Sequence, residues 1–142
     1  MTRQEALISL NMIPGIGSVV LSRLLEYLEK PEKIFQVSAE KLIQISGINQ
    51  QSARGIRAFK KEDLEKDLAL AKKQGLRIMV IEDKDYPRNL KQIPGAPIVL
   101  YLKGELKSED QYSIGIVGSR RASFYGLNKA QEFAAQLSEK KF

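Results

Sequence analysis

The chain has 142 residues, 43% of them hydrophobic, which is enough for one ordinary domain or two small ones with a buried core. It lacks cysteine and histidine, which excludes disulfides, thiolate nucleophiles, Ser-His-Asp triads and the usual zinc sites, and we expect no metal or cofactor. The net charge of +6 suits an anionic partner, and without a membrane-length apolar run or a signal-like start we expect a cytoplasmic protein that makes no membrane contact.

The first half of the chain has apolar residues at helical spacing. Ser38 is a candidate N-cap, and Gly75 is a candidate helix terminator. The pattern predicts helices over residues 3–13, 19–28, 39–45, 50–59 and 62–75.

Two segments of this helical part form an internal repeat. "IPGIGSVVL" and "ISGINQQSA" align with Gly15 and Gly47 at equivalent places, 32 residues apart. Both resemble the helix-hairpin-helix motif, although Leu21 is bulkier than the small residue of that motif and Asn49 replaces its second glycine. The sequence therefore indicates a helical domain with two hairpins over residues 1–75.

The hairpin glycines have two interpretations. They can bring backbone N–H groups at a helix start to a phosphate, with Gly15, Gly17, Gly47, Arg54 and Arg57 as a weak DNA contact. Alternatively, they only turn the chain between packed helices. Packing is favoured, because the region up to residue 47 carries five basic and five acidic residues and is neutral.

Beyond Gly75 the apolar residues gather in short runs bounded by Pro and Gly. These runs predict strands over 76–82, 98–104 and 113–118, followed by a helix over 123–140 with Ser123 as its N-cap. Such apolar strands are typical of a sheet covered on both faces, as in α/β folds. We therefore expect a second domain over residues 76–142.

A glycine turn with two arginines joins the third expected strand to the last helix. Gly118 permits close approach of a ligand, Ser119 offers a hydroxyl, and Arg120 and Arg121 suit phosphate oxygens, while Tyr125 can stack on a base or pack beneath the turn. The spacing matches neither the dinucleotide fingerprint nor the P-loop. An anion site and an ordinary strand-to-helix turn with solvated arginines both remain open.

Several motifs together resemble one family. "LNMIPGIG", "LIQISGI", "DYPRNLKQIPGAPIVLYLKG" and "SIGIVGSRRASFYG" are similar, in order and approximate spacing, to the DNA processing protein A (DprA/Smf) family. The resemblance implies a helical sterile-alpha-motif-like domain followed by the first part of an extended Rossmann-like domain. It also implies that this chain is an N-terminal portion, with a truncated second domain.

The resemblance further implies a protein that binds and protects single-stranded DNA and helps load the RecA recombinase during natural transformation, without catalysis. Gly118, Ser119 and Arg120 match the family's DNA pocket, with Arg121 adding charge. The motif's remaining positions are Ser123, Tyr125 and Gly126. A homodimer is implied for the full-length protein, with most dimer and RecA contacts beyond this portion.

Two other function classes remain open. One is a Rossmann-like enzyme that binds a nucleotide or nucleoside phosphate at the same turn, although no carboxylate follows Arg120 before Glu132. The other is a protein-interaction module formed by the neutral N-terminal helices. Three strands with a single covering helix are also expected to leave apolar sheet surface exposed, which favours self-association.

Overall fold

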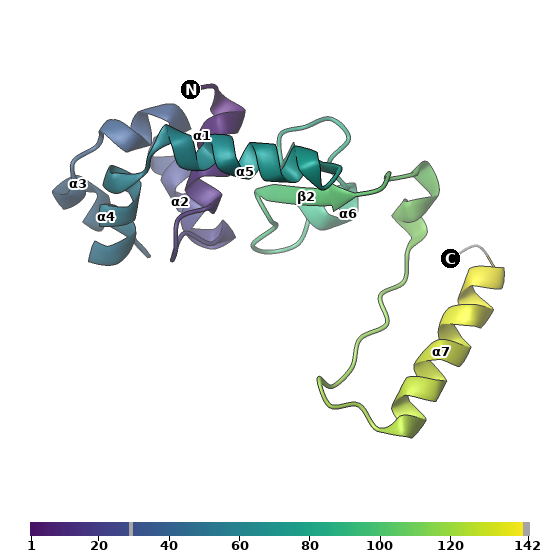
Figure 1. Cartoon of the computed structure of the whole chain (residues 1–142). Coiled ribbons are helices and arrows are strands. Elements are labelled where there is room, and N and C mark those ends of the chain that lie inside the picture. The colour runs from purple at the N-terminus through teal and green to yellow at the C-terminus, as the bar shows by residue number, and fades with distance from the viewer. Residues whose placement is uncertain (29, 141–142) are drawn as a thin grey trace. The chain divides into compact units, whose positions relative to one another are not determined.

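The computed structural model describes residues 1–28 and 30–140, and it forms two compact units, Met1–Gly104 and Glu105–Phe142. The first unit contains α1 (Arg3–Asn11), α2 (Ser18–Tyr27), η1 (Pro31–Gln36), α3 (Ala39–Ile43), α4 (Gln50–Ala58), α5 (Lys61–Lys73), β1 (Leu76–Val80), α6 (Arg88–Lys91) and β2 (Val99–Lys103). The second unit contains η2 (Ser108–Tyr112) and α7 (Phe124–Glu139). Within the first unit, helices α1–α4 gather at one end and β2 with α6 lies at the other, with α5 running between them (Figure 1).

Local sequence signals start and stop the helices. A capping box begins α1, because the Thr2 hydroxyl accepts from the Glu5 N–H at 3.1 Å and the Thr2 N–H donates to the Glu5 carboxylate at 2.7 Å. The predicted cap Ser38 accepts from the Lys41 N–H and starts α3. The helix expected to end at Gly75 ends at Lys73, and Gly75 follows with φ +66°. All five helices predicted in the first half are confirmed.

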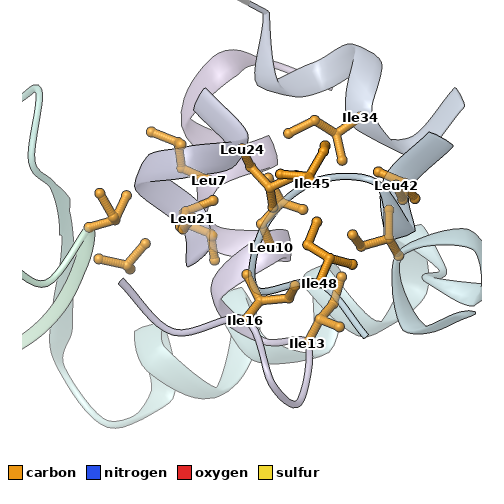
Figure 2. Packing of buried hydrophobic residues seen from close by; sticks show 14 of the residues in the cluster. Leu7, Leu10, Ile13, Ile16, Leu21, Leu24, Ile34, Leu42, Ile45 and Ile48 are labelled. Atoms are coloured by element: carbon orange, nitrogen blue, oxygen red, sulfur yellow. The ribbon is translucent and has the colours of Figure 1, made fainter. Parts of the chain in front are cut away.

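The core lies between α1 and the elements that surround it. Helix α1 contacts α2, η1, α5, β1 and β2, and Leu7 and Leu10 on it are fully buried. Figure 2 shows these leucines among Leu21 and Leu24 of α2 and side chains from the next turns. Burying each such side chain stabilises the fold by roughly 1.5–3 kcal/mol. The remaining labelled members of this cluster are Ile13, Ile16, Ile34, Leu42, Ile45 and Ile48.

The sheet is an antiparallel pair. Strand β1 pairs with β2 in a register that runs from Leu76 opposite Lys103 to Val80 opposite Val99. The neighbours Met79 and Val80 project to opposite faces and both are buried, so this end of the sheet is covered on both faces. Val80 and Val99 belong to the same core as α1, so the sheet and the helices share one hydrophobic interior.

The third predicted strand, 113–118, is wrong for this structure. The segment is irregular, and Ile114, Ile116 and Val117 are exposed, Val117 to 94%. A strand needs a neighbour to complete its hydrogen-bond ladder, and no strand among the described residues pairs with this segment. The fold is therefore mixed, with helices and a small antiparallel sheet.

The expected boundary near Gly75 lies inside the first compact unit. The two units separate after Gly104, because β1 and β2 pack with the helices. Two polar contacts add to this packing. The Tyr101 hydroxyl of β2 donates to the Asp67 carboxylate of α5 at 2.7 Å, and Arg3 of α1 binds Glu82, two residues beyond β1.

The Arg3–Glu82 ion pair predicts a pH dependence of stability. Hydrogen bonds from Arg3, of 2.7 to 3.0 Å, lower the pKa of Glu82, although partial burial opposes the shift. The ionised carboxylate is thus favoured by folding. Its contribution is complete above the unfolded pKa of about 4.3 and is lost as the pH falls through the lower folded value.

We expect Glu82→Gln to lower the free energy of unfolding at pH 7 by less than about 1 kcal/mol, since both side chains are partly exposed. The difference from wild type should shrink as the pH falls through the lowered folded pKa of Glu82, because the protonated carboxyl no longer pairs with Arg3. Urea unfolding at several pH values measures the difference in free energy of unfolding between the two proteins. A difference that stays constant with pH would show that the ionisation of Glu82 plays no part.

Candidate nucleic-acid interface

The predicted phosphate turn lies in the second compact unit, between the irregular segment 113–117 and α7. All of its predicted residues lie in one continuous stretch of chain, from Gly118 to Gly126. Gly126 is half-buried, and the other predicted residues, Gly118, Ser119, Arg120, Arg121, Ser123 and Tyr125, are exposed. Both guanidinium groups are therefore accessible to an anion.

Two serines fix the local backbone. The Ser119 hydroxyl accepts from the Arg121 N–H at 3.2 Å, which closes the turn that carries both arginines. The Ser123 hydroxyl accepts from the Gly126 N–H at 3.2 Å, so Ser123 is the N-cap of α7, as predicted. Ser119 thus has a structural role in the turn, while its hydroxyl hydrogen can still be donated to a ligand.

A concavity of about 620 Å³ lies beside this turn. Arg121 lines it, whereas Arg120 and Tyr125 do not. A Cβ built on Gly118 meets no atom within 4 Å, so the backbone there is open to a ligand. The lining combines polar turn residues with apolar side chains, and its full set is Ile116, Val117, Gly118, Ser119, Arg121, Ala122, Ser123, Gly126, Leu127 and Ala130.

Aromatic rings accompany the arginines. Tyr125 is 72% exposed and Phe124 is 80% exposed, so neither ring packs beneath the turn. Arginines with accessible aromatic rings suit a single-stranded nucleic acid, because the guanidinium binds phosphate and the ring stacks on a base. Phe124, unlike Tyr125, is not among the residues predicted from the sequence, although it follows the cap Ser123 directly.

The predicted stripe of α7 is on the surface. Leu127 and Phe133 are more than half exposed, and Ala134 is exposed as well. Lys129 and Glu132 form an ion pair on this helix. The apolar face of α7 therefore remains uncovered within its own compact unit.

The hairpin candidates belong to the first unit. Gly15, Gly17 and Gly47 lie in exposed turns, and Arg54 is exposed on α4. Arg57 donates to the Phe35 carbonyl oxygen at 2.6 Å, so its guanidinium already joins α4 to η1. Of the two candidate arginines, Arg54 is therefore the better placed for a ligand.

In residues 1–28 and 30–140, no group of acidic side chains is arranged to hold a metal ion. Over the same described stretch, no helix combines the length and apolar character needed to cross a bilayer.

Comparison with known proteins identifies relatives. Residues 77–142, which include the arginine turn, match the family described as DNA recombination-mediator protein A. Protein Smf of Synechocystis sp. is 26% identical over 138 residues, which are 93% of this chain and 34% of that protein. DNA processing protein DprA of Bacillus subtilis is 33% identical over 78 residues, 54% of this chain and 26% of that protein.

Protein Smf of Escherichia coli is 24% identical over 97 residues, 68% of this chain and 26% of that protein. The chain thus spans about a third or less of the length of these relatives. No solved structure matches it significantly. The family match over residues 77–142 and the agreement among these relatives show that the chain is similar to the DNA recombination-mediator protein A family and to the proteins named DprA and Smf.

Proposed function

We propose that this chain binds the backbone of single-stranded DNA through the turn from Gly118 to Gly126. The observation that carries the proposal is the pair of exposed arginines beside the open backbone of Gly118, within the segment that matches the recombination-mediator family. Guanidinium groups form paired hydrogen bonds with phosphate oxygens, and nearby backbone N–H groups can add to them.

The turn supports binding that is largely independent of base sequence. Phosphates would be held by Arg120 and Arg121, and bases would stack on Tyr125 and Phe124. Because phosphate contacts release counterions, affinity should fall steeply with salt. A duplex keeps its bases stacked inside the helix, so it should bind more weakly to the exposed rings.

In the whole protein, we propose that this binding protects DNA during recombination and helps to load RecA, by association and not by catalysis. The names of the relatives support a role in DNA processing. A helical sterile-alpha-motif-like domain, a Rossmann-like domain begun by β1 and β2, a homodimer and a cytoplasmic location belong to the same proposal. The chain covers only part of its relatives, so these properties concern the longer protein.

The experiment is a fluorescence anisotropy titration of labelled oligo-dT with the chain and its variants at low and moderate salt. We expect Arg120→Ala and Arg121→Ala each to weaken binding about tenfold. Each should also reduce the slope of log affinity against log salt concentration by about one, because one phosphate contact is lost. Lys140→Ala removes the same charge beyond the end of α7 and is the matched control, with little expected change. A duplex of equal length tests the preference for single strands.

Equal affinities for wild type, both arginine variants and the lysine control would exclude the turn as the binding site. Absence of any binding by the wild-type chain would refute DNA binding by this part of the protein.

A further inference from the structure

The first unit contains a third copy of the hairpin turn. "LKQIPGAP", residues 90–97, aligns with "LNMIPGIG", residues 10–17, and with "LIQISGIN", residues 42–49. The three segments end α6, α1 and α3, respectively. The third copy does not stand out as a hairpin in the sequence, because it is followed by a strand and not by a second helix.

The three turns have the same backbone geometry. In each, the residue after the glycine donates its N–H to an isoleucine carbonyl three positions earlier, at 3.0 Å from Ile16, 3.0 Å from Ile48 and 3.2 Å from Ala96. The central glycines Gly15, Gly47 and Gly95 have φ of 83°, 94° and 70°. This is the pattern of a type II turn, in which the third residue needs a positive φ.

The second and third turns lie against the beginning of α2. A Cβ built on Gly95 lies 3.4 Å from Val19 Cγ2, and one built on Gly47 lies 3.2 Å from Val20 Cγ2. The second and third turns therefore flank the start of α2, which itself follows the first turn. We call these turns, Ile13–Ile16, Ile45–Ile48 and Ile93–Ala96, the glycine-turn face.

The backbone donors of this face are not used by the fold. Gly15, Gly47 and Gly95 are exposed, and their N–H groups donate to no acceptor in the described parts of the chain. Positive charge accompanies them. The Arg23 guanidinium donates to the Ser46 carbonyl oxygen in the second turn at 3.3 Å, so it is already engaged there, as Arg57 is with Phe35. Helix α6, which leads into the third turn, contains Arg88 and Lys91 without an acidic residue.

We infer that the glycine-turn face binds the phosphate backbone of a nucleic acid, as a second contact besides the turn from Gly118 to Gly126. Unpaired exposed N–H groups are phosphate donors, and the three repeats offer the same donor at three points. The neutral charge of the first hairpin argued for a packing role, but the third turn supplies the positive charge that the first one lacks. This inference rests on the proposed function, because it assumes that the chain binds DNA.

The test uses charge-matched pairs of variants in the full chain. Gly17 has φ −86° and ψ 175°, nothing within 4 Å of its Cβ position and no side chain to cap α2. Asp and Asn both fit there and both cap a helix, but only Asp repels a phosphate. Pro94→Asp and Pro94→Asn make the same comparison in the third turn, where Pro94 is exposed.

Anisotropy with labelled oligo-dT and with a duplex measures the difference within each pair. We expect each Asp variant to bind about fivefold more weakly than its Asn partner, with a smaller salt dependence. Gln74→Asp and Gln74→Asn, at the far end of α5, measure the effect of net charge alone and should differ little. Circular dichroism confirms that all variants are folded.

The outcomes separate this inference from the proposed function. Equal affinities within both pairs, together with a loss of binding in Arg120→Ala, would overturn the glycine-turn face and leave the arginine turn standing. A difference within the pairs with no effect of Arg120→Ala would support this face and refute the arginine turn. If the wild-type chain binds neither oligonucleotide, both are wrong.

Discussion

Ending the chain at Gly75 is expected to abolish cooperative unfolding of the helical segment, whereas ending it at Gly104 should preserve it. The shorter fragment loses the buried side chains of Val80, Ile98 and Val99, which belong to the same core as α1. At about 2 kcal/mol each, these three contribute roughly 6 kcal/mol. That is comparable with the total stability of an ordinary domain, about 5–15 kcal/mol.

Thermal and urea unfolding of fragments 1–75 and 1–104, followed by circular dichroism at the helical wavelength, measures the effect. The fragment 1–104 keeps every element of the first compact unit and is the control. If fragment 1–75 instead melts in one sharp transition at the same midpoint, the helical segment is an independent domain, as the change of sequence pattern at Gly75 indicates.

Gly15→Ala should destabilise the first unit by about 2–3 kcal/mol. The backbone at Gly15 has φ +83°, a left-handed conformation that costs an L-residue about 1–2 kcal/mol. A Cβ there would also lie 2.5 Å from the Ser52 Oγ, so the hydroxyl must turn away from its hydrogen bond to the Pro14 carbonyl oxygen, or the hairpin or α4 must shift. The substitution therefore adds close contact to backbone strain.

A double-mutant cycle separates these two causes. Ser52→Ala removes the Oγ, so adding it to Gly15→Ala should recover about 1 kcal/mol relative to the sum of the single changes. Gly17→Asn, two residues away, is the control, and it should stabilise α2 by up to about 1 kcal/mol because it supplies the missing cap. Strict additivity in urea unfolding would show that the contact with Ser52 contributes nothing.

The helices were predictable because each is specified by local sequence. Apolar spacing located them, and Ser38 and Ser123 cap the helices that follow them, as expected. Both confirmed strands are short apolar runs. What such a run cannot reveal is its partner, and the antiparallel register of Leu76 with Lys103 depends on residues far apart in the chain.

This dependence on a distant partner also explains why the strand predicted over residues 113–118 does not form. An apolar run has the composition of a strand, but it becomes one only beside another strand, and Val117 is almost fully exposed here. The arginine turn could be predicted because its residues are contiguous. Its concavity could not, because Leu127 and Ala130 join the lining from the next turns of α7.

The contacts between the two predicted hairpins show a relation that neither hairpin shows alone. Gly15 faces Ser52, and Gly47 faces Val20. Val20 and Ser52 are 32 residues apart, the same interval that separates Gly15 from Gly47. Val20 of the first hairpin is therefore equivalent to Ser52 of the second. Each glycine contacts the equivalent residue of the other hairpin, as in a two-fold symmetric dimer. One hairpin thus has a self-complementary surface, and the helical segment is organised like a homodimer of hairpins carried on a single chain.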